Sequence, residues 1–335
     1  MLTVALDVMG GDYAGEEMVK GAKLALEKSQ NLSIKLVGKK DLIEGLIEKL
    51  SVPKDRVSVV EANEIITNEE APVMAVREKK DSSIVVGMNL VKQGEAKAFV
   101  SAGSTGAVLV GGQLIVGRIK GVLRAALAPV LPTKKGVSLL IDCGANVDAR
   151  SEHLVQFAKM GSIYMEKVFG INKPKVGIVN IGAEEEKGNA LVKETFPLLK
   201  MSKDINFIGS VEAREIPSGD CDVIVCEAFT GNVILKLYEG VGKTLLSEIK
   251  SALTEGFITK IGALLIKSAL KSKLKKFDTS EQGQGGAPML GLKGLVIKAH
   301  GNSKASEISK AILQCISFDE QNITSLIEES MLKAE

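Results

Sequence analysis

Tryptophan is absent from the 335-residue chain, and aromatic residues make up only 4% of it. This disfavours modules that bind nucleic acids by stacking bases on aromatic rings. Histidine occurs twice and cysteine four times, at positions 143, 221, 226 and 315, with no C-x-x-C pair. The usual zinc sites need a denser set of ligands, so we expect no metal and no other cofactor.

The chain also lacks a large net charge of either sign, and it lacks a long hydrophobic run. The 43 Lys and Arg residues nearly balance 41 Asp and Glu residues, which argues against a nucleic-acid partner. No run of 18 apolar residues could span a bilayer. Asp7 interrupts the apolar start at residues 2–6, so we expect no export signal. Unpaired cysteines without such a signal predict a cytoplasmic protein.

Short apolar runs alternate with amphipathic stretches along the chain. We expect strands at residues 2–6, 33–37, 57–60, 97–100, 137–141, 175–180, 206–208, 223–226 and 295–298. We expect helices at residues 16–28, 42–50, 103–116, 154–168, 190–199, 233–253 and 305–333. The alternation predicts an α/β fold with a mostly parallel sheet between helical layers. No linker divides residues 1–335, so we expect a single α/β domain.

Polar, glycine-bearing turns follow five of the predicted strands and begin at Asp7, Ser101, Asp142, Asn180 and Ala228. Ligands of open α/β sheets bind outside the carboxyl ends of the strands. One such turn is common for reasons of turn geometry alone, whereas five favour a shared binding site. The turn after Ser101 opens a predicted helix and suits phosphate, although G-x-G-x-x-G is absent.

Three side chains in or near these turns suit an anionic substrate. Lys187 either places a cation beside an anionic ligand or belongs to a solvated run of charges. Asn232 either caps a helix or donates to a substrate. His300 lies in a strand-to-helix turn and suits acid–base or oxyanion work, whereas a structural role is favoured for His153. No G-x-S-x-G motif supports a serine triad.

Residues 256–277 contain six lysines and no acidic residue. The apolar phase changes after Gly262, so we expect two short amphipathic helices with a break near residues 262–263. Such helices suit an anionic membrane surface or a partner helix, or their apolar faces pack on the body of the protein. The apolar face of the first helix consists of Phe257, Ile258, Ile261, Leu264 and Leu265.

An ordered set of motifs extends from the first strand to about residue 330. It lies at residues 7–12, 101–107, 116–121, 127–129, 142–148, 187–189, 229–233, 285–287 and 297–301. This set resembles the PlsX family of acyl-ACP:phosphate acyltransferases. The resemblance implies a homodimeric α/β/α sandwich similar to isopropylmalate dehydrogenase-type enzymes. It also implies transfer of a long acyl chain from acyl carrier protein to inorganic phosphate, giving acyl phosphate for phospholipid synthesis.

The resemblance also implies partners and residue roles. Its catalytic residues are Lys187, Asn232 and His300, and phosphate itself is the nucleophile. The implied partners are acyl carrier protein, an anionic membrane touched at residues 256–277, and the glycerol-3-phosphate acyltransferase that uses acyl phosphate. The substrate- and phosphate-binding residues are Asp7, Gly10, Gly11, Asp12, Gly103, Ser104, Thr105, Gly106, Asn146, Asn189 and Gly231.

The sequence departs from the family pattern in three places. Tyr13-Ala14-Gly15 stands where His-Ala-Pro is usual, and Glu227-Ala228-Phe229 where Asp-Gly-Phe is usual. Gln282-Gly283-Gln284 replaces an aromatic approach to the following glycines. Two alternative functions stay open: a phosphotransacetylase-like enzyme that uses a short acyl-CoA, and a non-catalytic membrane scaffold for lipid-synthesis enzymes.

Overall fold

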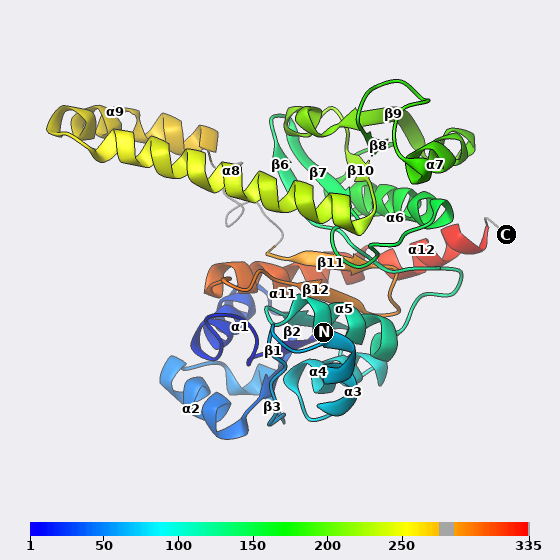
Figure 1. The fold of residues 1–335 in the computed structure, drawn as a ribbon. Helices are drawn as coiled ribbons and strands as arrows, with labels where there is room; N and C mark the ends of the chain where they lie inside the picture. The colour runs from blue at the N-terminus through cyan, green and yellow to red at the C-terminus, as the bar shows by residue number, and fades with distance from the viewer. Residues whose placement is uncertain (275–284, 334–335) are drawn as a thin grey trace.

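The computed structural model describes residues 1–274 and 285–333, and its strands form two sheets (Figure 1). The first sheet has the strand order β3-β2-β1-β4-β12-β11-β5, and the second has the order β6-β7-β10-β8-β9. β11 runs antiparallel to both of its neighbours and β6 runs antiparallel to β7, while the other described pairs are parallel. The predicted α/β class with mostly parallel strands is confirmed.

The first sheet is built from the two ends of the chain, and the second sheet is built from the part between them. The first sheet consists of β1 (Leu2–Asp7), β2 (Leu32–Gly38), β3 (Val57–Glu61), β4 (Ala98–Ser101), β5 (Ala126–Leu127), β11 (Ala287–Leu290) and β12 (Leu295–Lys298). The second consists of β6 (Val130–Thr133), β7 (Gly136–Ile141), β8 (Lys175–Asn180), β9 (Asn206–Glu212) and β10 (Val223–Val225). The chain therefore leaves the first sheet after β5 and returns to it at β11.

Helices cover both faces of the first sheet because successive strand side chains point to opposite faces. Val4 and Leu6 of β1 pack in one cluster, and Ala5 between them packs in another. The first cluster holds α1 (Glu16–Lys28), α2 (Lys40–Leu50) and α11 (Ala305–Glu320). The second holds α3 (Pro72–Glu78), α4 (Ser83–Lys92) and α5 (Thr105–Gly111), which continues into a π-helical turn, Gly112–Val116.

The second sheet lies between α6 (Ser151–Phe169) with α7 (Ala190–Met201) on one face and the base of α8 (Ala228–Thr254) on the other. Two 3₁₀ turns, Lys54–Arg56 and Ala213–Ser218, complete the connections.

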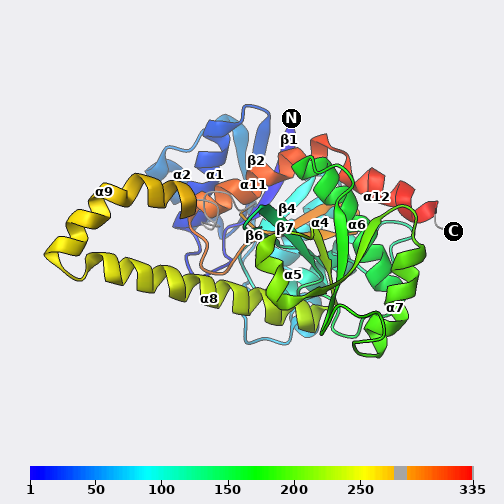
Figure 2. The ribbon, with the colours of Figure 1, turned by 90° about the horizontal axis from the view of Figure 1, so that it is seen from above.

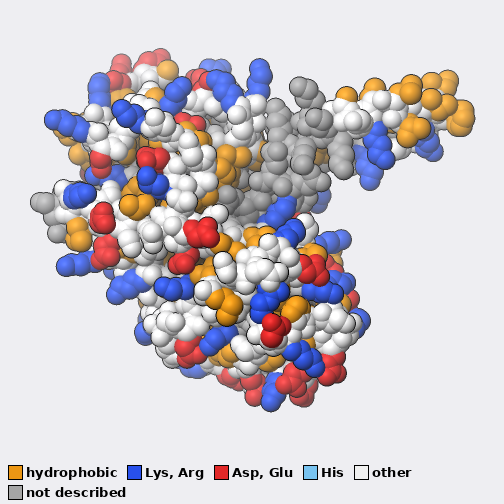
Figure 3. Space-filling view, turned by 180° about the vertical axis from the view of Figure 1, so that it is seen from behind, with side chains coloured by type: hydrophobic (Ala, Val, Ile, Leu, Met, Phe, Trp, Pro, Cys, Tyr) orange, Lys and Arg blue, Asp and Glu red, His pale blue; other side chains and the backbone are white. Residues whose placement is uncertain are grey.

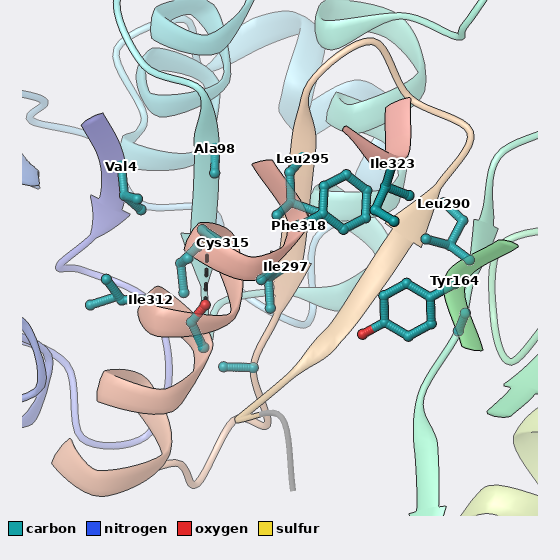
Figure 4. Packing of buried hydrophobic residues seen from close by; sticks show 14 of the residues in the cluster. Val4, Ala98, Tyr164, Leu290, Leu295, Ile297, Ile312, Cys315, Phe318 and Ile323 are labelled. Carbon is teal, nitrogen blue, oxygen red and sulfur yellow. Dashed lines mark hydrogen bonds between the residues drawn. The ribbon is translucent and has the colours of Figure 1, made fainter. Parts of the chain in front are cut away.

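A single apolar cluster joins the two sheets. It extends from Val4 through α6 and α12 (Ile323–Leu332) into the second sheet (Figure 4). Within it the ring centroids of Tyr164 and Phe318 lie 6.4 Å apart. The two sheets thus share one continuous apolar core.

α8 and α9 (Phe257–Leu274) form a hairpin that projects from the body of the molecule (Figure 2). The expected break near residues 262–263 is wrong, because α9 continues through Gly262. A glycine inside a helix destabilises it by only about 1 kcal/mol relative to alanine. The helix-forming residues on either side of Gly262 offset this loss. Phe277, the last apolar residue of the expected pair, lies outside the described residues.

Other predicted helices differ from the structure in their bounds, and α8, for example, begins five residues before the expected helix at 233–253. The helix expected at residues 103–116 begins at Thr105, since Ser104 caps it. The helix expected at residues 305–333 is two helices, α11 and α12. The chain turns between them at Asn322, whose φ of 52° is left-handed. Asparagine adopts that conformation more readily than most residues, so the turn has a local cause.

Candidate active site

Three turns meet at the carboxyl ends of β1, β4 and β12, which are neighbours in the first sheet. The Ser101 hydroxyl donates to the Asp7 carboxylate over 2.6 Å. The Asp12 N–H donates to the Gly301 carbonyl over 2.7 Å. The segments that hold Asp7–Asp12, Ser101–Gly106 and His300 therefore lie side by side.

Three more turns meet at the ends of β7, β10 and β8, which are neighbours in the second sheet. The Ala228 N–H donates to the Asn146 carbonyl over 3.0 Å, so the start of α8 is fixed to the turn after β7. The Asn180 side chain donates to the Lys187 carbonyl over 3.2 Å and holds the loop that carries this lysine. The second sheet thus contributes Asn146, Lys187 and Asn232 to its own group of turns.

The two groups of turns face one another. His300 Nε2, from the first sheet, lies 3.8 Å from Glu239 Oε2 on α8. Asn232 precedes Glu239 by seven residues, or two helical turns, so both lie on the same side of α8. Leu109 of α5 is also in contact distance of the turn after β7, 3.8 Å from where a Cβ on Gly144 would stand. His300 therefore meets α8 at Glu239, on the side of the helix that also carries Asn232, roughly 10 Å further along the axis.

Lys187 lies in the loop between β8 and α7, with its side chain 48% exposed. Its ammonium group pairs with Glu184 over 2.8 Å, and this hydrogen bond raises the pKa of Lys187. Among the contacts between described residues, Lys187 reaches neither Asn232 nor His300. The structure therefore places the three predicted catalytic residues on facing turns without joining them directly.

Several of the predicted binding side chains have partners inside the protein. Asn146 donates to the Asp142 carboxylate and to the Ala125 carbonyl, each over 2.8 Å. Asn189 accepts from the N–H of Val192 and caps α7, and Ser104 caps α5 in the same way. Asp12 and Thr105 are exposed.

The glycines of these turns let backbone segments approach one another. A Cβ on Gly106 would lie 2.4 Å from Pro72 of α3, and a Cβ on Gly10 would lie 2.4 Å from the Asp7 carboxylate. Gly11 has a φ of 91°, which favours glycine. A Cβ on Gly103 would lie 3.2 Å from Asp7. Packing of the turns on each other therefore accounts for these glycines, whatever ligand the surface binds.

The capping role considered for Asn232 is wrong. Glu227 caps α8 instead, accepting from the N–H groups of Phe229 and Thr230 over 2.6 and 3.0 Å. The half-buried amide of Asn232 therefore lies in the second turn of the helix, where no cap is needed. The structural role favoured for His153 is confirmed. Its Nδ1 accepts from the Arg150 N–H at the start of α6, and burial lowers its pKa.

Sequence reasoning assigned no role to the side chains of two buried charged residues that support these turns. Asp142 is fully buried and accepts from the N–H groups of Leu127, Gly144, Ala145 and Asn146. Burial raises the pKa of Asp142, although these hydrogen bonds oppose the shift. Lys298 is buried at the end of β12. For both residues, the sequence feature that could have indicated this role is a charged residue at the end of an apolar strand.

The fold of the chain is shared with enzymes of known structure. A phosphotransacetylase from Streptococcus pyogenes shares the fold with a TM-score of 0.62 and 18% identity, covering 95% of this chain and 94% of that one. The EutD phosphotransacetylase from Staphylococcus aureus shares it with a TM-score of 0.57 and 16% identity, covering 94% and 93%. The fold is thus that of phosphotransacetylases.

The comparison of sequences narrows the class to one family. The model of the fatty acid synthesis protein family matches residues 2–326. A phosphate acyltransferase from Clostridium perfringens is 50% identical over 332 residues, covering 99% of this chain and 97% of that protein. A phosphate acyltransferase from Thermoanaerobacter pseudethanolicus is 50% identical over 330 residues, covering 98% and 97%. The chain belongs to this family, the PlsX family, and is an acyltransferase.

Proposed function

We propose that this enzyme transfers a long-chain acyl group from the thioester of acyl carrier protein to inorganic phosphate, giving acyl phosphate for phospholipid synthesis. The observation that supports the proposal is the contact of His300 with Glu239 on α8, the helix whose second turn carries Asn232. The names of relatives at 50% identity support phosphate as the acceptor. A protein carrier as the donor rests on the sequence motifs.

In the proposed reaction a phosphate oxygen attacks the thioester carbonyl carbon. A C–O bond forms, the carbonyl electrons move to oxygen, and their return breaks the C–S bond, so that the carrier thiol leaves with a proton. Lys187 neutralises the negative charge, and Asn232 and His300 donate hydrogen bonds to the oxyanion. Burial raises the pKa of Cys143 and Cys226 well above the usual value, so neither thiol supplies a competing nucleophile at neutral pH.

The phosphate-binding surface is proposed to comprise the turns of both sheets, with Asp12, Thr105 and Asn189 as exposed members of the predicted binding set. The buried members of the predicted binding set, such as Asp7 and Asn146, shape these turns through their internal hydrogen bonds.

The test is an assay of the purified enzyme with long-chain acyl-ACP and phosphate, without added metal or nucleotide. We expect acyl phosphate to form, trapped as a hydroxamate, and the rate with acetyl-CoA to be far lower. A preference for acetyl-CoA would instead support the phosphotransacetylase-like alternative, which the shared fold keeps open. No turnover with either donor would support the scaffold alternative.

We also propose that the enzyme is cytoplasmic and associates peripherally with anionic membranes through the tip of the hairpin. Phe257, Ile258, Leu264 and Leu265 of α9 are each more than 70% exposed. They gather where the hairpin projects farthest from the body, with lysines nearby (Figure 3). In the described part of the chain, no helix combines the length and apolarity needed to cross a bilayer. Surface binding is therefore the mode that these residues favour.

The membrane proposal predicts that Ile258→Ser and Leu265→Ser weaken binding to liposomes of anionic lipid. Burying one such side chain contributes about 1.5–3 kcal/mol, so each change should lower the partition coefficient roughly tenfold or more. Flotation assays at low and high salt measure this, and salt should weaken the part that depends on lysines such as Lys260. Met201→Ser, which alters another exposed apolar residue far from the hairpin tip, is the matched control. Equal binding by all variants would contradict the proposal.

We also propose that the enzyme is a homodimer, because α8 carries a row of exposed apolar side chains. Exposed apolar side chains recur every four residues along α8, at Phe229, Val233, Leu237, Val241 and Leu245. Residues four apart form one ridge of a helix, and such ridges pack against a second helix. A second copy of the chain is the partner that the family resemblance implies for this surface.

A further inference from the structure

Lys298 is a buried lysine at the end of a strand of the first sheet. β12 ends with Lys298, whose side chain is 9% exposed and follows the buried Leu295, Val296 and Ile297. Lysine is rarely buried unless its ammonium group has partners, because removing the charge from water is costly. A role is therefore needed to account for Lys298, and none has been assigned to it so far.

The Lys298 ammonium group joins two turns that lie beside it. It donates to the Ala102 carbonyl, in the turn after β4, over 3.4 Å. It also donates to the Ala299 carbonyl, which forms the peptide bond to His300. The Ala299 N–H in turn donates to the Ser101 carbonyl over 2.9 Å. The chain just before His300 is thus held at both of its polar backbone groups.

Two acidic residues face the same ammonium group. Asp7, on β1, is fully buried, and Asp12 lies in the turn that follows this strand. Both favour the charged form of Lys298, although burial is the larger effect and lowers its pKa to about 8. Asp12 also fixes the chain just after His300, because its N–H donates to the Gly301 carbonyl over 2.7 Å.

We propose that Lys298 is a positioning residue, whose buried ammonium group holds the Ala102 and Ala299 carbonyls together and thereby orients His300 toward α8. It acts through the backbone and does not touch the substrate. The inference rests on the proposed function for its activity readout, since His300 is a donor to the oxyanion in that reaction. Small displacements of a catalytic group are costly, with about 1 Å reducing rates on the order of 100-fold.

The test compares Lys298→Met with Lys298→Arg. Methionine has similar length and no donors, so we expect kcat for acyl phosphate formation to fall at least tenfold while KM for phosphate changes little. Arginine keeps a permanent charge and its donors, and we expect it to restore part of kcat. Lys293→Met, at an exposed lysine two residues before β12, is the matched control. A folded Lys298→Met variant with unchanged kcat would overturn the inference.

A second readout does not depend on activity. The chain has only two histidines, so NMR of the imidazole C–H groups distinguishes His300 from His153. We expect Lys298→Met to shift or broaden the His300 signal and to leave the His153 signal in place. In the wild-type protein, the His300 signal should show a further step near pH 8, when Lys298 loses its proton. A His300 signal that is insensitive to both changes would overturn the inference even if the wild type forms no acyl phosphate.

Activity and stability should also respond to pH in opposite directions. The folded pKa of Lys298, about 8, lies below the ordinary lysine value of 10.5, so the unfolded chain binds more protons between these values. The contribution of Lys298 to the free energy of unfolding therefore rises with pH in this window. kcat should fall over the same window, whereas a residue that only stabilises the fold would let activity follow stability.

Discussion

Replacing Lys187 by alanine is expected to leave the fold intact and to lower kcat for acyl phosphate formation by roughly 100-fold or more. Removal of one donor to a developing oxyanion typically has an effect of this size. The fold should survive because the side chain is half exposed and its one described ion pair, with Glu184, lies at the surface. Exposed pairs of this kind contribute little to stability. Steady-state kinetics and thermal unfolding of the same preparation measure both quantities.

Lys200→Ala provides a matched control for this prediction. Lys200 is 61% exposed and pairs with Glu185 over 2.7 Å, so the change removes a similar ion pair from a nearby surface. We expect this variant to keep wild-type kcat and stability. Full activity in Lys187→Ala would remove Lys187 from the mechanism, and equal losses in both variants would point to a general effect of surface charge.

The sequence pattern predicted the buried, parallel strands well because their signal is strong. β8 and β12, for example, have the expected bounds, and each lies between two other strands of its sheet. β5, β6 and β11 were missed because Pro129, Pro132 and Pro288 lie in or beside them. Proline normally argues against a strand. Those strands belong to antiparallel pairs, whose pairing depends on distant segments that a local pattern does not show.

The turns of the candidate site were predicted from their glycines, but the pattern did not show what the glycines approach. The missing Cβ of a glycine permits close contact with a ligand or with another part of the protein. The sequence shows a glycine in either case and does not distinguish the two. At Gly106 and Gly231 the neighbour is the protein itself. The supporting roles of Lys298 and Asp142 were not predicted because a single charge after an apolar run also fits an ordinary strand end. Their burial becomes visible only when the neighbouring turns are placed.

Gly231→Ala is expected to lower both stability and activity because α8 begins against the turn after β7. A Cβ at Gly231 would lie 1.9 Å from the Asp142 carbonyl oxygen and 2.9 Å from its carbon. Backbone atoms cannot rotate away as a side chain can, so the first turn of α8 must move and carry Asn232 with it. Overpacking of this kind costs about 1–3 kcal/mol. We expect a lower midpoint in thermal unfolding and a large fall in kcat.

The same substitution further along α8 should have the opposite effect on stability. Gly240 is exposed, and a Cβ there would meet nothing within 4 Å. Alanine is favoured over glycine in a helix by about 1 kcal/mol, so Gly240→Ala should raise the unfolding midpoint and leave kcat unchanged. The two variants make the same chemical change in one helix. They differ because Gly231 is buried against the backbone of Asp142 and Cys143, whereas Gly240 is exposed. If Gly231→Ala were as stable and active as Gly240→Ala, the turn after β7 would not be what positions Asn232.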